Sequence, residues 1–131
     1  MSRRYGIIGC RPPRKDSSTY ERDSATYENI RTAVAEYVMS LPEDSVVVSG
    51  GAIGVDSVAV EAARARGLKV VEHLPDYKRH GGKMAPLVRN ILIVDDSDEV
   101  IAFPAPWSTG TWHAVGVARD KRKMLCVKKY T

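Results

Sequence analysis

Two loops in this sequence combine glycine with hydroxyl side chains in a way that suits phosphate binding. Each loop follows an apolar run and precedes a stretch with helical spacing, so each is predicted to join a strand to a helix. Glycine lets an anion approach the main-chain N–H groups, and the first turn of a helix adds unpaired donors and a positive dipole end. The first loop consists of Ser49, Gly50, Gly51, Ala52, Ile53 and Gly54, and the second of Pro104, Ala105, Pro106, Trp107, Ser108, Thr109, Gly110 and Thr111. Together they predict a site for a phosphorylated ligand.

Other side chains near these loops have both a chemical and a structural interpretation. Cys10 follows the first apolar run, between Gly9 and Arg11, where either a reactive thiol or an inert small residue fits. Trp107 can stack on a nucleobase or cover its own loop. The hydroxyls of the second loop can bind phosphate, or form a turn and a helix cap. His73 and His80 lack metal-ligand spacing to any cysteine or aspartate, so no metal is expected.

The composition is that of an ordinary globular protein. The chain has 131 residues, of which 44% are hydrophobic and 27% charged, and this length predicts one domain, residues 1–131. No segment approaches the roughly 20 apolar residues that span a bilayer, and the first apolar run is too short for a signal peptide. Cys10 and Cys126 are far apart and are expected to be reduced thiols. These features favour a cytoplasmic protein without a membrane partner.

The formal net charge of +4 leaves nucleotides and nucleic acid open as partners. Much of the excess lies near the two ends of the chain, in Arg3, Arg4, Arg11, Arg14, Lys15, Lys121, Arg122, Lys123, Lys128 and Lys129. Nucleic-acid-binding proteins usually show a denser basic stripe with interleaved aromatics, so a solvated surface explains these residues as well.

Apolar runs and helical spacing alternate along the chain. The predicted strands are 4–9, 46–49, 68–74, 99–103 and 124–128. The predicted helices begin after Asp23 or Ser24 and end at Pro42, then span 56–66, 86–95 and 111–121, with Pro86 at a first helical position. Residues 11–22 and 75–83 are expected to be irregular.

Strict alternation of strands and helices predicts a Rossmann-like α/β fold. Its three layers would be a five-stranded parallel sheet, in the order 3-2-1-4-5, with helices on both faces. Ligands of such sheets bind beyond the carboxyl ends of the strands, where the strand order reverses. Both glycine-containing loops follow strands and therefore fall at that edge.

Three motifs in this order resemble the SLOG superfamily, and within it the small YspA-like proteins that are often of phage or bacterial origin. They are the first loop with Asp56, the stretch from Pro75-Asp76-Tyr77 through Gly81-Gly82-Lys83 to Arg89-Asn90, and Ile101 to Pro104 with Gly110-Thr111. The likeness covers residues 46–127. It implies a Rossmann-like fold that binds nucleotides or related ligands between the two loops.

The resemblance also assigns individual residues. Gly50, Gly51 and Gly54 would form the first loop, and Asp56 would either hold a ribose hydroxyl or cap the following helix. Arg89 and Asn90 match an Arg-Asn pair that faces the site in YspA-like proteins. A guanidinium is a planar fork that suits phosphate, although an arginine solvated on a helix fits the same position.

The second loop departs from that of the LOG-type phosphoribohydrolases in the same superfamily. Those enzymes carry a glutamate shortly after the Gly-Thr pair, whereas Trp112, His113 and Ala114 follow it here. Departure of a nucleobase needs protonation of its nitrogen or stabilisation of an oxocarbenium-like centre, so the missing carboxylate argues against that reaction. If the chain is a hydrolase, Asp56, Asp76 or His113 must supply the proton chemistry.

Three functions therefore compete. The first is binding of a nucleotide or nucleotide-derived phosphorylated molecule, the expected ligand, through Gly9, Arg11, Ser49, Arg89, Asn90, Pro104, Trp107 and the two loops. The second is hydrolysis of a nucleoside 5′-monophosphate. The third, suggested by DprA proteins of the superfamily, is binding of single-stranded nucleic acid through Arg11, Arg14, Lys15 and the lysines near the end of the sequence. Related proteins commonly dimerise through their helices, so a homodimer is one assembly to test.

Overall fold

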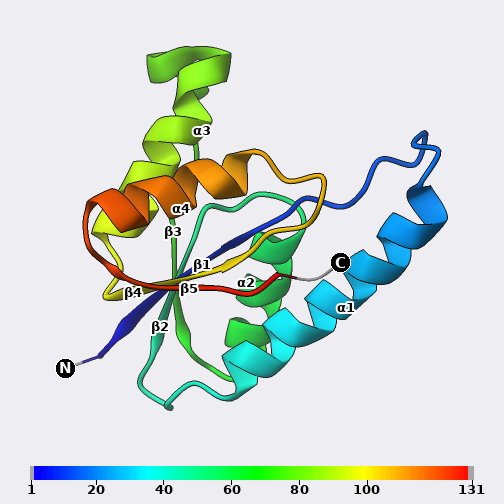
Figure 1. The fold of residues 1–131 in the computed structure, drawn as a ribbon. Coiled ribbons are helices and arrows are strands. Elements are labelled where there is room, and N and C mark those ends of the chain that lie inside the picture. Colours follow the sequence, from blue (N-terminus) through cyan, green and yellow to red (C-terminus); the bar gives the residue numbers. More distant parts are fainter. Residues whose placement is uncertain (1, 130–131) are drawn as a thin grey trace.

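The computed structural model describes residues 2–129, in which five strands and four helices alternate (Figure 1). The strands are β1 (Arg4–Gly9), β2 (Val46–Ser49), β3 (Lys69–Glu72), β4 (Glu99–Phe103) and β5 (Met124–Val127). The helices are α1 (Tyr20–Met39), α2 (Val55–Ala65), α3 (Tyr77–Asp95) and α4 (Gly110–Asp120). No helix in this part of the chain is both long enough and apolar enough to cross a membrane.

The strands form one parallel sheet in the order β3-β2-β1-β4-β5, which confirms the predicted topology. Gly6 of the central strand lies between Val48 of β2 and Val100 of β4. The chain first adds strands on one side of β1 and then crosses to the other side with β4. The strand order therefore reverses between β1 and β4, which is where open α/β sheets bind ligands.

The helices cover the two faces of the sheet in pairs, α1 with α2 and α3 with α4 (Figure 1). The first core contains Ile30 and Val34 of α1 and Ala59 and Ala63 of α2. The small alanines let α2 pack close to the sheet. The second core joins Ile93 and Val94 of α3 to Ala114, Val115 and Ala118 of α4.

Helix α1 begins earlier than its sequence suggests. Asp23 and Ser24, the expected caps, lie inside its first turns, and the N-cap position is Thr19. The N–H of Asp23 donates to the carbonyl of Thr19 at 2.9 Å, so the helical ladder already begins there. The predicted cap was wrong because aspartate is also favoured within the first turn, where it complements the helix dipole.

Helix α3 differs most from the prediction. Asp76 caps it by accepting a hydrogen bond from the Arg79 N–H at 3.1 Å, and the helix begins at Tyr77 within the stretch expected to be irregular. Only Gly81 leaves helical geometry, with φ 79°, and it produces a kink. Pro86 therefore lies inside the helix and not at its first position. The exposed segment before the kink extends away from the sheet (Figure 1).

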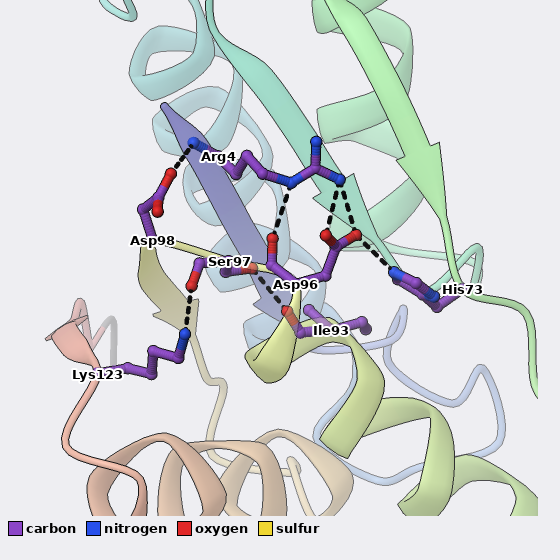
Figure 2. A network of polar contacts seen from close by, with 7 residues as sticks. All are labelled: Arg4, His73, Ile93, Asp96, Ser97, Asp98 and Lys123. Carbon is purple, nitrogen blue, oxygen red and sulfur yellow. Dashed lines mark hydrogen bonds and ion pairs between the residues drawn. The ribbon is translucent and has the colours of Figure 1, made fainter. Parts of the chain in front are cut away.

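A polar network fixes the connection between α3 and β4 (Figure 2). The Arg4 guanidinium donates to the backbone carbonyl and the carboxylate of Asp96, both at 2.9 Å, and His73 Nε2 lies 2.8 Å from the same carboxylate. Burial opposes ionisation of Asp96, but the hydrogen bonds from Arg4 and His73 outweigh it and lower its pKa. The network holds the carboxyl end of α3 beside the sheet, and so fixes the helix that carries Arg89.

Candidate functional site

A cavity of about 550 Å³ lies at the carboxyl ends of β1 and β4. Its wall is formed by the β1–α1 connection, the start of α2, the middle of α3, and the second loop with the start of α4. The predicted site residues found in the wall are Gly9, Arg11, Asp56, Arg89, Asn90, Trp107, Ser108, Thr109, Gly110 and Thr111. The structure thus brings together residues from both ends of the chain.

The other predicted residues lie outside the cavity wall. They are Ser49, Gly50, Gly51, Gly54 and Pro104, together with the proposed proton donors Asp76 and His113. Asp76 caps α3, and His113 contacts Asn90. Of the three acid–base candidates named from the sequence, only Asp56 lines the cavity.

The glycines of the first loop serve its packing. Gly54 has φ 104° and ψ −132°, and a Cβ there would lie 2.4 Å from the carbonyl oxygen of Cys10. Gly51 has φ 70°. Positive φ at these two positions lets the loop turn beneath the end of β1, where Val55 N–H donates to the Cys10 carbonyl at 3.1 Å. The loop itself reaches the cavity through Ala52.

Arg89 is a buried cation in the wall of the cavity, with a relative exposure of 8%. Its Nη1 donates to the Gly50 carbonyl at 2.8 Å, and its Nε donates to Asn90 Oδ1 at 3.1 Å. Within residues 2–129 it makes no ion pair with any carboxylate. A buried charge is normally paired, so this guanidinium favours an anion in the cavity.

Asn90 connects Arg89 to the start of α4. Its side-chain amide lies 3.4 Å from the Gly110 carbonyl and 3.2 Å from His113 Nδ1. Because the amide nitrogen is the donor, His113 Nδ1 must accept. The Arg89–Asn90 pair therefore links the first loop, through Gly50, to the second loop and α4.

Asp56 is a buried carboxyl group in the wall of the cavity. It is 6% exposed, and its Oδ2 accepts a hydrogen bond from the Ala52 N–H at 3.1 Å. Burial raises the pKa of Asp56 to about 6, although the Ala52 hydrogen bond and the Arg89 charge oppose that shift. The N-cap of α2 is Gly54, so Asp56 braces the loop and does not cap the helix.

The second loop closes the other side of the cavity. Trp107 Nε1 donates to the Arg11 carbonyl at 2.9 Å and so ties this loop to the β1–α1 connection. Ser108 Oγ accepts from the Ala105 N–H at 2.8 Å. The side chain of Thr109, at the N-cap position, makes no capping hydrogen bond to α4, and the first residues of the helix, Gly110 and Thr111, lie in the wall. The unpaired N–H groups of that first turn can donate to an anion.

The sequence interpretation did not assign Ser17 and Asp23 to the site. Both line the cavity, and Asp23 is 8% exposed. Asp23 lies on the same helix face as Thr26 and Ile30, at the helical spacing that marks the buried side of α1. The sequence signal that could have identified Asp23 is a carboxylate on the face of α1 that the helical spacing marks as buried.

Cys10 lines the cavity but is 1% exposed. Burial raises the pKa of its thiol to about 11. The thiolate is the nucleophilic form, and this pKa keeps the sulfur protonated near neutral pH. The geometry therefore favours the inert interpretation of Cys10.

Comparisons with known proteins identify the family. Residues 19–80 match the family model described as "YspA, cpYpsA-related SLOG family". The match includes α1 and the first loop but not Arg89 or the second loop. The motifs that resemble the SLOG superfamily in the sequence lie further along the chain, in residues 46–127. Gene 61 protein of Mycobacterium phage D29 is 38% identical over 93 residues, which cover 66% of this chain and 74% of that protein.

Solved structures share the fold. DNA processing protein A from Helicobacter pylori, described for its single-stranded DNA binding mode, is 24% identical with a TM-score of 0.66. The alignment covers 95% of this chain but only 64% of that one, so this chain spans less than two thirds of its length. TM1055 is 20% identical with a TM-score of 0.60, and the alignment covers 94% of this chain and 72% of that one.

These structures support the Rossmann-like fold, and the phage protein is a relative of which this chain covers nearly three quarters. Together with the family-model match, this relationship places the protein in the YspA, cpYpsA-related SLOG family.

Proposed function

We propose that this protein binds a nucleotide or a nucleotide-derived phosphorylated molecule in the cavity between β1 and β4. The observation that carries the proposal is Arg89, a buried cation that faces the cavity without an ion pair from the described residues. The first turn of α4 adds N–H donors on the same side. Membership of the SLOG family supports a nucleotide or nucleic-acid ligand.

The size and composition of the cavity support a ligand of this class. Its volume of about 550 Å³ lies within the range of small-molecule sites, roughly 300 to 1,000 Å³. Arg89 and the start of α4 would hold the phosphate. Trp107 would contact the base through its ring, because its indole N–H already donates to the Arg11 carbonyl and is not free to bind the base.

Replacing Arg89 by alanine tests the phosphate assignment. A charge-assisted hydrogen bond is worth about 1.5–3 kcal/mol, so we expect the affinity for a nucleoside monophosphate to fall roughly 10- to 100-fold. The matching nucleoside, which lacks the phosphate, should be nearly unaffected. Titration calorimetry with adenosine, AMP, cytidine and CMP measures both effects.

The matched control is Arg119→Ala, which removes an exposed arginine from the last turn of α4. It should leave both affinities unchanged. An equal loss for nucleoside and nucleotide in Arg89→Ala would mean that Arg89 only braces the Gly50 carbonyl. In that case the phosphate has to be placed elsewhere.

We expect binding without hydrolysis. No glutamate follows the Gly-Thr pair, and the His113 side chain is engaged by Asn90 outside the cavity wall. Asp56 alone among the named acid–base candidates could protonate a leaving base. Incubation with AMP and CMP followed by chromatography should show no free base. Several turnovers per protein, lost in Asp56→Asn, would instead establish a phosphoribohydrolase.

Single-stranded nucleic acid is a second candidate, because a structural neighbour with this fold binds single-stranded DNA. Arg11 and Arg14 are exposed at the edge of the cavity, where a strand could pass. Contacts with several phosphates make affinity fall steeply with salt, while a single nucleotide in a buried site responds weakly. The salt dependence of binding to an oligonucleotide and to AMP separates the two functions.

A further inference from the structure

The cavity is lined by cations and carboxylates from several elements. The Arg89 guanidinium and the first turn of α4 donate hydrogen bonds, and Asp56 lies close enough to feel the Arg89 charge. Asp23, in the first turn of α1, lines the same cavity, and its carboxylate can only accept. Arg14, on the β1–α1 connection, is exposed and pairs with Asp16 at 2.9 Å. Asp23 is therefore a buried hydrogen-bond acceptor in the cavity wall.

A chain of hydrogen bonds orients the Asp23 carboxylate. Thr19 Oγ1 donates its only proton to Asp23 Oδ2 at 2.6 Å. Ser17 Oγ lies 3.0 Å from Thr19 Oγ1, so Ser17 must be the donor in that contact. Ser17 Oγ also accepts from the Thr19 N–H at 3.3 Å. The hydroxyl protons in this series of hydrogen bonds all point toward Asp23. Ser17 can therefore offer the cavity only an acceptor lone pair.

Asp23 has unused acceptor capacity. Its Oδ1 forms an ion pair with the Nε of exposed Arg22 at 3.6 Å, beyond hydrogen-bond distance, and receives no hydrogen bond from the described residues. A buried carboxylate favours hydrogen-bond donors on both oxygens to offset its desolvation. The described residues supply a donor to Oδ2 only, which leaves Oδ1 open to a donor on a bound molecule.

We propose that Asp23 selects the ligand by accepting hydrogen bonds from N–H or O–H groups of the bound nucleotide. The inference rests on the proposed function, since it assumes that a nucleotide fills the cavity. Two parts of a nucleotide carry such donors, the ribose hydroxyls and the N–H groups of the base. A second anionic group placed against Asp23 would be rejected, because it would face a buried carboxylate.

Paired nucleotides distinguish the two sources of the donor. Each ribonucleotide compared with its 2′-deoxy counterpart tests the hydroxyl. AMP against purine riboside 5′-monophosphate and CMP against zebularine 5′-monophosphate test the amine, because these analogues lack the amino group and carry no ring N–H. We expect the wild-type protein to prefer the member with the donor in one of these sets. Asp23→Asn should weaken that member roughly 10- to 100-fold and remove most of the preference. Its amide oxygen can still accept from Thr19, which preserves the helix start.

The control is Asp120→Asn, which removes the same charge from the exposed carboxyl end of α4, away from the cavity. It should keep the wild-type preference. Melting curves by circular dichroism check that Asp23→Asn is folded, and Asp23→Glu, which keeps the charge, should retain part of the preference.

Four outcomes would overturn the inference. Wild-type protein that binds nucleotides without preference in either set removes its basis, as does an Asp23→Asn protein that keeps the preference. An equal loss for every ligand in that variant would make Asp23 structural. These three leave the proposed function standing. If the wild type binds none of the nucleotides, the proposed function fails, and the inference fails with it.

Discussion

Replacing Gly54 by alanine should lower the free energy of unfolding by about 4 kcal/mol, the largest effect we expect from a single methyl group in this chain. Gly54 adopts φ 104°, which side chains rarely tolerate, and the new Cβ would lie 2.4 Å from the Cys10 carbonyl oxygen and 2.9 Å from Arg11 Cα. Both obstacles are backbone atoms, so a rotamer change cannot relieve the contact. Relief requires the first loop to move away from β1.

Thermal and urea unfolding measure this loss, which corresponds to a fall of roughly 15 °C in Tm for a chain of this size. Gly116→Ala is the matched control, because Gly116 lies inside α4 and a Cβ there meets nothing within 4 Å. That change should stabilise the protein by about 0.5–1 kcal/mol. Equal stability of the two variants would contradict the backbone conformation assigned to the first loop.

Removing the buried carboxyl with Asp56→Asn should make the protein less sensitive to pH between about 4 and 6. Burial raises the pKa of Asp56 in the folded state to about 6, above the unfolded value near 3.9. The folded state therefore binds the proton more tightly. The stability from this group is fully present below about pH 4, and it is lost as pH rises through 6.

A difference of two pKa units corresponds to about 3 kcal/mol. Subtracting the unfolding free energy of Asp56→Asn from that of the wild type, at each pH, cancels the other titrating groups. We expect this difference to fall by about 2 kcal/mol between pH 4 and pH 6.5. The lowered pKa of Asp96 acts only below this window. A constant difference would mean that Asp56 is solvated and ionised like a surface aspartate.

The sheet could be predicted from sequence because its signals are local. The first four strands are apolar runs, each followed by a stretch with helical spacing, and right-handed crossovers leave few arrangements for such a chain. Helix starts were harder to predict. Aspartate is favoured both at the cap and within the first turn, so the sequence suggested a start at Asp23, where the backbone starts at Thr19.

The site could be predicted only in part, because its key contacts join distant residues. Arg89 was named from a motif, but its contact with the Gly50 carbonyl crosses 39 positions and has no local signature. The glycines were recognised as breaks in the pattern, yet the loop they form is shaped by the backbone at Cys10, which the sequence does not reveal. Asp23 was missed because its place in the cavity wall depends on which face of α1 is buried.

The pairing of β1 with β4 also bears on how the chain acquires its fold during synthesis. Tyr5 pairs with Glu99 and Gly9 with Phe103, so the central strand gains its second neighbour only after synthesis has reached residues 99–103. At the usual 5–20 residues per second, β1 waits roughly 5 to 20 s on the ribosome with one edge unpaired. An unpaired edge recruits other strands, including those of neighbouring nascent chains. This protein therefore depends on late, non-local closure, and a chain that stops before β4 exposes the edge for good.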